Sequence, residues 1–500
     1  MSAAPHRHLT AAETSRIANH ALAEQREEDW VGPVAASADR HREDPVLWQW
    51  AALLHRALDD REAAIYAFDR AAGLAPRNAK IVHGLARTRW EAGLPSLEDY
   101  GRALALAPFD GDVLLGMAAA RVTAGDRDGA LAGIEAILAR EPRWIEGQRQ
   151  AASLRFMRGE VPGYVAGIEH ALGAHPREEG LWQELLTLLQ QSGDHDRTAA
   201  AAIRARGAIG DRPFITAALA TVASSTGDVR GADLGFAALS PLNDVSVTIH
   251  HVRHLLRNAR IDHVGKLLDH WLNQPEATAF HPYATLVWRL TGDPRIDWLE
   301  RNGALIRTFD LTASLPPLDR LATTLRGLHH DGGHPLDQSV RGGSQTDGPL
   351  FANLNADVQQ TRLAVLEAVR TYMDGLPPVA LRHPTLEHRR NDRPRFAGSW
   401  SVRLRGAGRH ANHVHPAGWI SSALYVGLPS DRPGDEPEAG WLSLGEPPSE
   451  LRLDLSAERM IKPVSGTLVL FPSTTWHGTR PFMEGERLTI AFDIARPVPR

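Results

Sequence analysis

The sequence predicts a multidomain protein in which an N-terminal all-α solenoid is followed by a β sandwich or jelly roll with flanking helices. Three observations predict this fold class. The 500 residues are too many for one ordinary hydrophobic core. Turn residues recur about every 34 residues through the first half of the chain. From Phe396 onward, apolar residues alternate with a period of two, in short segments that turn signals separate.

The composition is that of a soluble globular protein, with 43% hydrophobic and 23% charged residues. A net charge of −5 gives no reason to expect nucleic acid as a partner. The absence of cysteine excludes disulfides and thiolate chemistry. The polar N-terminus predicts no signal peptide, and no apolar window is long enough to cross a membrane. Lysine occurs only at positions 80, 266 and 462, a bias typical of GC-rich bacterial genomes, so we expect a bacterial cytoplasmic protein.

The first half of the chain is a series of predicted helix-turn-helix units. Prolines follow the turns by 17 residues in three units, where the missing N–H of proline is tolerated at the start of a helix. This spacing resembles the tetratricopeptide repeat. The resemblance implies a concave face that binds a protein or peptide, with a packing or dimerisation module as the alternative. The turn residues, in steps of 34, 32, 34, 34 and 34, are Asp59, Gly93, Gly125, Gly159, Gly193 and Gly227.

Three segments are predicted. Residues 1–43 form a helical or flexible lead-in, and residues 44–313 form the tetratricopeptide-like solenoid. Within the solenoid, the helical pattern from about residue 258 to 313 lacks a clean period and predicts helices that cap its end. The prolines at 316 and 317 mark the boundary, and residues 314–500 form the β-rich domain.

The second domain begins with a polar, glycine-rich loop, residues 335–348, which either lines the mouth of a site or is an ordinary connection; its position next to the β-rich region favours the first. A helix is predicted at about residues 355–373. Strands are predicted at 400–404, 413–428, 441–444, around 460–463, 467–471 and 488–494. A turn-rich loop at 406–411 and a solvated loop at 431–440 separate the first of these strands.

Three histidines and one arginine form the candidate site. His413 and His415 are two residues apart on a predicted strand and therefore point to the same face. His477 follows an apolar run that ends at Pro472. Two histidines that are close in sequence and one distant histidine are a typical ligand set for a metal ion in a β-barrel pocket. Arg487, ten residues past His477 (487 − 477), is well placed to hold an acidic cosubstrate. We interpret the site as an iron site that uses 2-oxoglutarate.

The order of motifs supports this interpretation. An arginine-bearing strand is followed by the histidine dyad, then by Gly-x-Leu-x-Leu-Gly at 440–445. Next come Pro-x-x-Gly-x-Leu-Val-Leu-Phe-Pro-Ser-x-x-x-His at 463–477 and Arg-x-Thr-Ile-Ala-Phe at 487–492. From about residue 338 to 494 the sequence resembles the Fe(II)- and 2-oxoglutarate-dependent oxygenase superfamily, on its prolyl-hydroxylase-like side. More closely, it resembles bacterial oxygenases of this kind that are fused to tetratricopeptide repeats.

This resemblance implies a double-stranded β-helix that binds Fe(II) and 2-oxoglutarate. It implies that His413 and His477 are metal ligands and that Arg487 pairs with the distal carboxylate of 2-oxoglutarate. Thr489 and Tyr425 are expected to add hydroxyl contacts to the cosubstrate. His410 and Asn412 are candidates for hydrogen bonds to the ligands. No catalytic residue beyond the metal site is predicted.

The third metal ligand departs from the family pattern, because position 415 is His where the family has Asp or Glu. Three interpretations follow. His415 is itself the ligand, a loop carboxylate such as Asp435 or Glu436 replaces it, or the position is left to water or a halide. We predict His415, because residues i and i+2 of a strand face the same way.

The predicted function is Fe(II)- and 2-oxoglutarate-dependent hydroxylation of a protein, peptide or metabolite that the solenoid recruits. One alternative is a non-catalytic repeat scaffold with a degenerate jelly roll. The other is a cupin-like metalloenzyme that does not use 2-oxoglutarate. The second alternative would retain its activity without 2-oxoglutarate and would not depend on Arg487.

Overall fold

The computed structural model describes residues 10–330, 339–388, 393–430 and 436–497. The chain divides into two compact units. Unit 1 comprises Met1–Ile134, Asp347–Arg362 and Pro497–Arg500, and unit 2 comprises Glu135–Thr346 and Leu363–Arg496. In sequence order, helical repeats are followed by antiparallel sheets, which confirms the predicted fold class.

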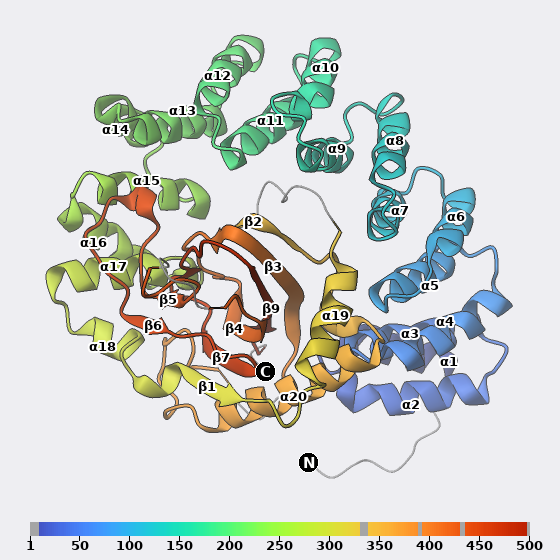
Figure 1. Ribbon diagram of the computed structural model, residues 1–500. Helices are drawn as coiled ribbons and strands as arrows, with labels where there is room; N and C mark the ends of the chain where they lie inside the picture. Colours follow the sequence, from blue (N-terminus) through green and yellow to red (C-terminus); the bar gives the residue numbers. More distant parts are fainter. Residues whose placement is uncertain (1–9, 331–338, 389–392, 431–435, 498–500) are drawn as a thin grey trace. The chain divides into compact units, whose positions relative to one another are not determined.

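Unit 1 is built from helices that lie side by side in pairs (Figure 1). Side-chain caps start several of them. The Asp44 carboxylate accepts the Val46 N–H ahead of Pro45, and the Asn78 and Asp110 side chains do the same for their own helices. The helices are α1 (Ala11–Ala23), α2 (Glu27–Arg40), α3 (Pro45–Ala57), α4 (Arg61–Leu74), α5 (Ala79–Glu91), α6 (Leu97–Leu106), α7 (Gly111–Thr123) and most of α8 (Arg127–Leu138).

The predicted turn residues mark the repeat in the structure. All six positions, from Asp59 to Gly227, have a positive φ of 60° to 92° and lie between consecutive helices. The period extends one step further at each end, to Gln25 (59 − 25 = 34) with φ 52° and to Ala259 (259 − 227 = 32) with φ 54°. Neither is glycine, which normally supplies this left-handed conformation, so the sequence pattern conceals both turns.

Unit 2 continues the helical series. Its helices are α9 (Ile145–Met157), η1 (Gly163–Val165), α10 (Ala166–Ala174), α11 (Glu179–Gln191), α12 (His195–Ile209), α13 (Pro213–Thr226), α14 (Val229–Ala238), α15 (Val245–Arg257), α16 (Ile261–Trp271), η2 (Ala277–Ala279), α17 (His281–Thr291), α18 (Arg295–Leu299), η3 (Gly303–Leu305), α19 (Leu318–Leu328) and η5 (Ser449–Leu451). The helix α20 (Ala356–Asp374) begins in unit 1 and ends in unit 2, and η4 (Leu350–Ala352) lies in unit 1. No helix among the described residues is long and apolar enough to span a membrane.

The last helices of the series share a core with the β-rich part of unit 2. Residues of α15 to α18 form one buried cluster with Leu451 and Trp476. The Trp476 indole N–H donates to the Pro282 carbonyl at 2.7 Å, and Arg289 pairs with Glu458 at 2.7 Å. These helices therefore pack on the barrel as well as ending the helical series. The predicted boundaries at 43/44 and 313/314 stay predictions, and this shared core lies across the second of them.

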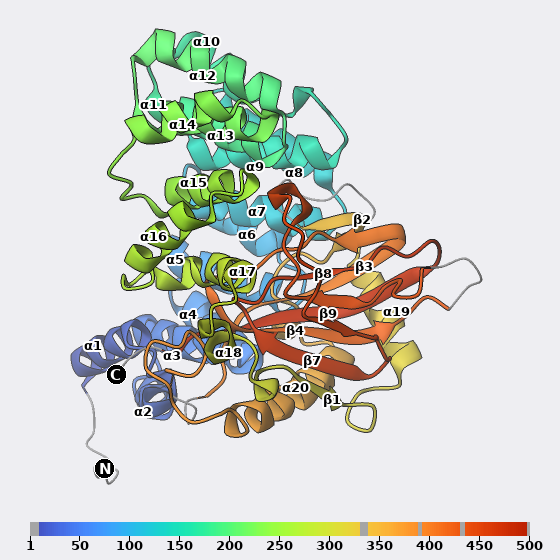
Figure 2. The same ribbon diagram turned by 90° about the vertical axis from the view of Figure 1, so that its left-hand side faces the viewer.

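The β-rich part contains two antiparallel sheets. The larger has the order β1-β7-β4-β9-β3-β2 and the smaller the order β6-β5-β8. Figure 2 shows β7, β4, β9 and β3 side by side. The nearly continuous burial of β4 indicates that both of its faces are covered. The strands are β1 (Arg307–Asp310), β2 (Val340–Gln345), β3 (Phe396–His410), β4 (Gly418–Gly427), β5 (Leu442–Leu444), β6 (Arg459–Ile461), β7 (Thr467–Pro472), β8 (His477–Thr479) and β9 (Glu486–Ala495).

Three local predictions were wrong. The turn-rich loop at 406–411 is mostly strand, because β3 continues to His410 and pairs there with β2. The polar segment at 335–348 contains β2 where a loop was predicted, and its residues 335–338 lie outside the described part. The strand predicted at 413–428 begins only at Gly418, because Pro416 lacks an N–H and a turn closes from the Gly418 N–H to the His415 carbonyl at 2.9 Å.

Candidate metal and cosubstrate site

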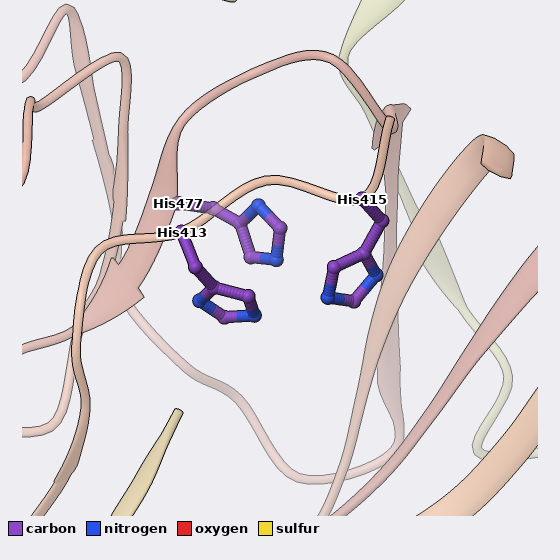
Figure 3. A group of neighbouring side chains, drawn as sticks. All are labelled: His413, His415 and His477. Carbon is purple, nitrogen blue, oxygen red and sulfur yellow. The ribbon is translucent and has the colours of Figure 1, made fainter. Parts of the chain in front are cut away.

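The three predicted histidines lie together in unit 2. His413, His415 and His477 each offer a ring nitrogen, and these atoms all lie within 4.8 Å of one another. Figure 3 shows the three imidazoles turned toward a common point. The rings of His413 and His477 are the closest pair, with centroids 4.2 Å apart. Within the part of the chain that the structure describes, this is the one cluster of potential metal ligands.

The backbone holds the two histidine segments together although residues 411–417 are not a regular strand. The N–H of His413 donates to the carbonyl of His477 at 2.9 Å, and the reverse bond is 3.0 Å long. The N–H of His415 donates to the Ser473 carbonyl at 2.9 Å. This isolated bridge explains why the histidines converge without the strand that the spacing argument assumed.

Each ring has a hydrogen-bond partner at Nδ1. The Nδ1 atom of His413 lies 2.8 Å from the Ala411 carbonyl, and that of His477 lies 3.0 Å from the Thr475 carbonyl. The Nδ1 of His415 lies 2.7 Å from Oδ2 of Asp493. Because carbonyl and carboxylate oxygens only accept, each Nδ1 carries the proton and leaves the Nε2 lone pair for a metal ion. A further contact, 3.3 Å long, joins Nε2 of His413 to the Ser339 hydroxyl.

Burial keeps two of these imidazoles neutral. Burial, together with a smaller contribution from the neighbouring His415, lowers the pKa of His413 to about 4. Burial likewise lowers the pKa of His477 well below its ordinary value, with additional contributions from His413 and His415. Neutral imidazole is the form that binds a metal, so the site is ready for a cation at neutral pH.

Asp493 on β9 is a polar residue of the site that the sequence analysis missed. It contacts His415, and it lines the cavity that the three histidines face. Strand alternation contained the signal, because residues 487, 489, 491 and 493 all face one side of β9. Of the alternative loop ligands, Glu436 is exposed and absent from the ligand cluster, and Asp435 lies outside the described residues.

The two other predicted ligand partners differ from each other. The His410 ring stacks on His413 with centroids 6.1 Å apart, and its Nδ1 lies 3.3 Å from the Thr479 hydroxyl. The Asn412 side chain instead donates to the Pro447 carbonyl at 3.1 Å. These hydrogen bonds thus go elsewhere than to the three histidines: that of His410 to Thr479, and that of Asn412 to the loop after β5.

Arg487 is a buried cation with only 2% of its surface exposed. Its guanidinium lies 5.2 Å from the centre of the Tyr425 ring. Neither its Nε nor the Tyr425 hydroxyl has a hydrogen-bond partner of good geometry among the described residues, and no described carboxylate forms an ion pair with it. Burial lowers the pKa of Arg487, and only Tyr425 offsets this. A guanidinium in such a position is set to receive an anion.

One cavity of about 710 Å³ joins these groups. Its walls include the three histidines, Arg487, Thr489 and Asp493. Tyr425 is not a wall residue and reaches the site only through Arg487. The helical series also contributes to the walls, with Gln191 at the end of α11, Arg253 on α15 and Tyr283 on α17.

The residues present fit the metal and the cosubstrate that the resemblance implies. Three neutral imidazoles on one side of a cavity are a suitable donor set for a divalent transition metal such as Fe(II). The guanidinium of Arg487, which has no counter-ion among the described residues, fits a carboxylate, which it can bind through two parallel N–H···O bonds.

Comparison with known proteins finds a family match in the C-terminal part. Residues 398–493 match the family described as "Putative 2OG-Fe(II) oxygenase". No curated protein matches the chain. Among solved structures, a prolyl-4-hydroxylase from Pseudomonas putida is 18% identical, with 39% of this chain and 94% of that chain covered and a TM-score of 0.26.

Two further solved structures are also similar. A tetratricopeptide repeat protein from Parabacteroides merdae is 15% identical, with 48% of this chain and 96% of that chain covered and a TM-score of 0.30. MamA from Desulfovibrio magneticus is 13% identical, with 35% and 99% covered and a TM-score of 0.30. Such low scores say nothing about the activity of this chain. The resemblance drawn from the sequence is confirmed: a helical series precedes a segment, residues 398–493, that matches the family described as "Putative 2OG-Fe(II) oxygenase".

Proposed function

We propose that this protein is an Fe(II)- and 2-oxoglutarate-dependent dioxygenase that hydroxylates a protein or peptide recruited by its helical repeats. One observation carries the proposal. A buried guanidinium without a counter-ion among the described residues shares a cavity with three converging imidazoles. The family match of residues 398–493 supports the same reaction class.

In this proposal the side chains divide the work between metal and cosubstrate. His413, His415 and His477 hold the ion through Nε2, and their Nδ1 partners fix the ring orientations. When bound, Fe(II) with 2-oxoglutarate and dioxygen supplies an oxidant that can hydroxylate an unactivated C–H bond. Arg487 orients the distal carboxylate, and the Thr489 hydroxyl, two residues on, adds a hydrogen bond on the same strand face.

The helices supply a reason to favour a polymeric substrate. Arg253 and Tyr283, from α15 and α17, stand in the wall of the cavity that contains the metal site. Arg253 pairs with Glu450 at 2.5 Å, and the Tyr283 ring packs edge-on against Trp476 with centroids 5.6 Å apart. A chain that follows the helical series would thus meet the cavity at these residues. A metabolite is the alternative substrate, and the cytoplasmic location stays a prediction.

Release of succinate tests the reaction class. Purified protein with Fe(II), 2-oxoglutarate and ascorbate in air should form succinate, and His477→Ala should abolish this. Arg487→Ala should lower it strongly at low 2-oxoglutarate, because the carboxylate loses a buried, charge-assisted partner. Arg405→Ala, an exposed arginine on β3, is the matched control and should behave like wild type.

Succinate release, measured together with the binding of Fe(II) and of 2-oxoglutarate, distinguishes the two competing functions. A non-catalytic scaffold would form no succinate and would bind no Fe(II). A metalloenzyme that does not use 2-oxoglutarate would bind Fe(II) normally, and the Arg487→Ala variant would bind 2-oxoglutarate no more weakly than wild type. Either result would overturn the proposal.

A further inference from the structure

Asp493 makes the strongest polar contact to the candidate metal centre. Its Oδ2 accepts the Nδ1–H of His415 over 2.7 Å, whereas the other two histidines donate to backbone carbonyls. The side chains of His415 and Asp493 are 23% and 13% exposed, so the pair is largely shielded from water. A charged acceptor in such surroundings raises the electron-donating power of the ring more than a neutral carbonyl does.

A second layer of hydrogen bonds fixes this carboxylate. The Ser421 hydroxyl donates to Oδ1 of Asp493 over 2.6 Å and lies 2.9 Å from the Ser473 hydroxyl. Ser473 in turn accepts the backbone N–H of His415 through its carbonyl. Gly418 leaves room for this arrangement, because a Cβ there would lie 2.7 Å from the Ser473 hydroxyl oxygen. Both oxygens of Asp493 therefore have partners, and Asp493 is not a member of the ligand cluster.

We infer that Asp493 is a positioning residue that supplies the negative charge of this metal centre through His415. The inference rests on the proposed function. Related centres have a carboxylate as the third direct ligand, where this chain has His415. Three neutral imidazoles would leave the full double charge of the ion uncompensated. Asp493 compensates this charge indirectly, because its hydrogen bond to Nδ1 of His415 transfers electron density through the ring to Nε2.

A double-mutant cycle on Co(II) affinity tests this role without requiring turnover. Asp493→Asn keeps the shape of the side chain and should weaken Co(II) binding by about 10- to 100-fold. The matched control is Glu486→Gln on the same strand, whose carboxylate pairs with Arg326 and Arg403 instead. Its Co(II) affinity should stay within about two-fold of wild type.

The same substitution is then made in a His415→Asp background. A carboxylate now binds the ion directly, so Asp493→Asn should no longer weaken Co(II) binding and should relieve repulsion between two acids. A merely structural role for Asp493 would produce the same loss in both backgrounds. Thermal unfolding of the metal-free variants checks that each one is folded.

Each possible result of the Co(II) measurements either supports or overturns the inference. Equal Co(II) affinity of wild type and Asp493→Asn, or an equal loss in both backgrounds, overturns it. Tight binding by His415→Ala also overturns it, because His415 would then not be a ligand. If Asp493→Asn does not fold, Ser421→Ala replaces it and should weaken Co(II) binding by about three- to ten-fold, since the carboxylate loses its orienting hydrogen bond. Failure of the wild type to bind Co(II) would instead refute the proposed function.

Discussion

Two buried arginines, Arg61 in unit 1 and Arg487 in unit 2, occupy opposite electrostatic situations. Both are nearly inaccessible, with 6% and 2% of their surface exposed, and burial lowers the pKa of both. Arg61 lies 3.1 Å from a Glu91 carboxylate oxygen and 3.5 Å from one of Asp59. Arg487 has only the face of Tyr425 and no carboxylate among the described residues.

This difference distinguishes an arginine that stabilises the fold from an arginine that belongs to the candidate site. Removing a cation from water costs several kcal/mol, which a carboxylate neighbour can offset. The helical unit supplies that carboxylate from its own sequence. In the β-rich part, no described carboxylate offsets the cost of burying Arg487. This is expected where an acidic ligand completes the site.

The largest expected effect on stability comes from removing the main carboxylate partner of Arg61, which brings Arg61 closer to the situation of Arg487. Glu91→Gln removes the charge that Arg61, Arg56 and Arg87 share, and it should lower the free energy of unfolding of unit 1 by about 3–5 kcal/mol. Urea unfolding, followed by far-UV circular dichroism, measures this. Glu62→Gln on α4 is the control, because Glu62 is exposed. Equal stability of wild type and Glu91→Gln would show that burial of Arg61 does not depend on its partner.

The opposite change in the free energy of unfolding is expected when Arg487 is replaced. Arg487→Met removes a buried cation without a counter-ion, so the metal-free protein without 2-oxoglutarate should be as stable as wild type or more stable, by up to about 1–4 kcal/mol. The measurement is the midpoint of thermal or urea unfolding. A clear loss of stability would mean that Arg487 has a structural role like that of Arg61.

Giving Arg487 an internal partner sharpens the comparison further. Thr489 faces the same cavity, and Thr489→Asp places a carboxylate beside the guanidinium. We expect 2-oxoglutarate affinity to fall about ten-fold, because the cosubstrate must displace this internal anion. Calorimetric titration of the Mn(II)-loaded protein measures the affinity, with Thr489→Asn as the uncharged control. Equal affinity of the Asp and Asn variants would argue against Arg487 as the carboxylate partner.

Acidification should affect the two units in different pH windows. Burial lowers the pKa of His281 and His383 in unit 2 to about 4 each. The unfolded chain therefore takes up protons first as pH falls below about 6.5, so their stability contribution is full above that pH and is lost toward pH 4. Burial alone would raise the pKa of Glu91, but Arg56 and Arg61 lower it overall, so its contribution is lost only below about 4.5.

We therefore expect a small loss of thermal stability between pH 7 and pH 5. Unit 2 should begin to lose stability before the Glu91 ion pairs of unit 1 do. Thermal scans at half-unit pH steps reveal this, and His383→Gln should flatten the pH dependence. A transition whose midpoint stays constant down to pH 5 would contradict the assignment of buried, neutral histidines.

The sequence revealed those features that depend on local residue type. Glycines at a regular spacing located the repeat turns, and Gln25 and Ala259 were missed because they adopt the same conformation without being glycine. The histidine spacing located the triad, although residues 411–417, where that argument assumed a strand, are irregular and β4 begins only at Gly418. Asp493 was missed because an acid on a strand ordinarily faces water. Strand alternation placed it on the same face as Arg487, but its pairing with His415 is a property of the folded chain. The missing counter-ion of Arg487 is likewise a property of the folded chain alone.

An anaerobic titration with 2-oxoglutarate tests the central claim most directly. Fe(II)-loaded wild type should develop a broad visible absorption band as the cosubstrate chelates the ion. The Arg487→Met variant should need about 30- to 1,000-fold more 2-oxoglutarate, the loss expected when one partner of a buried charge pair is removed. The absence of a band in wild type at any concentration, or identical midpoints for the two proteins, would contradict the account.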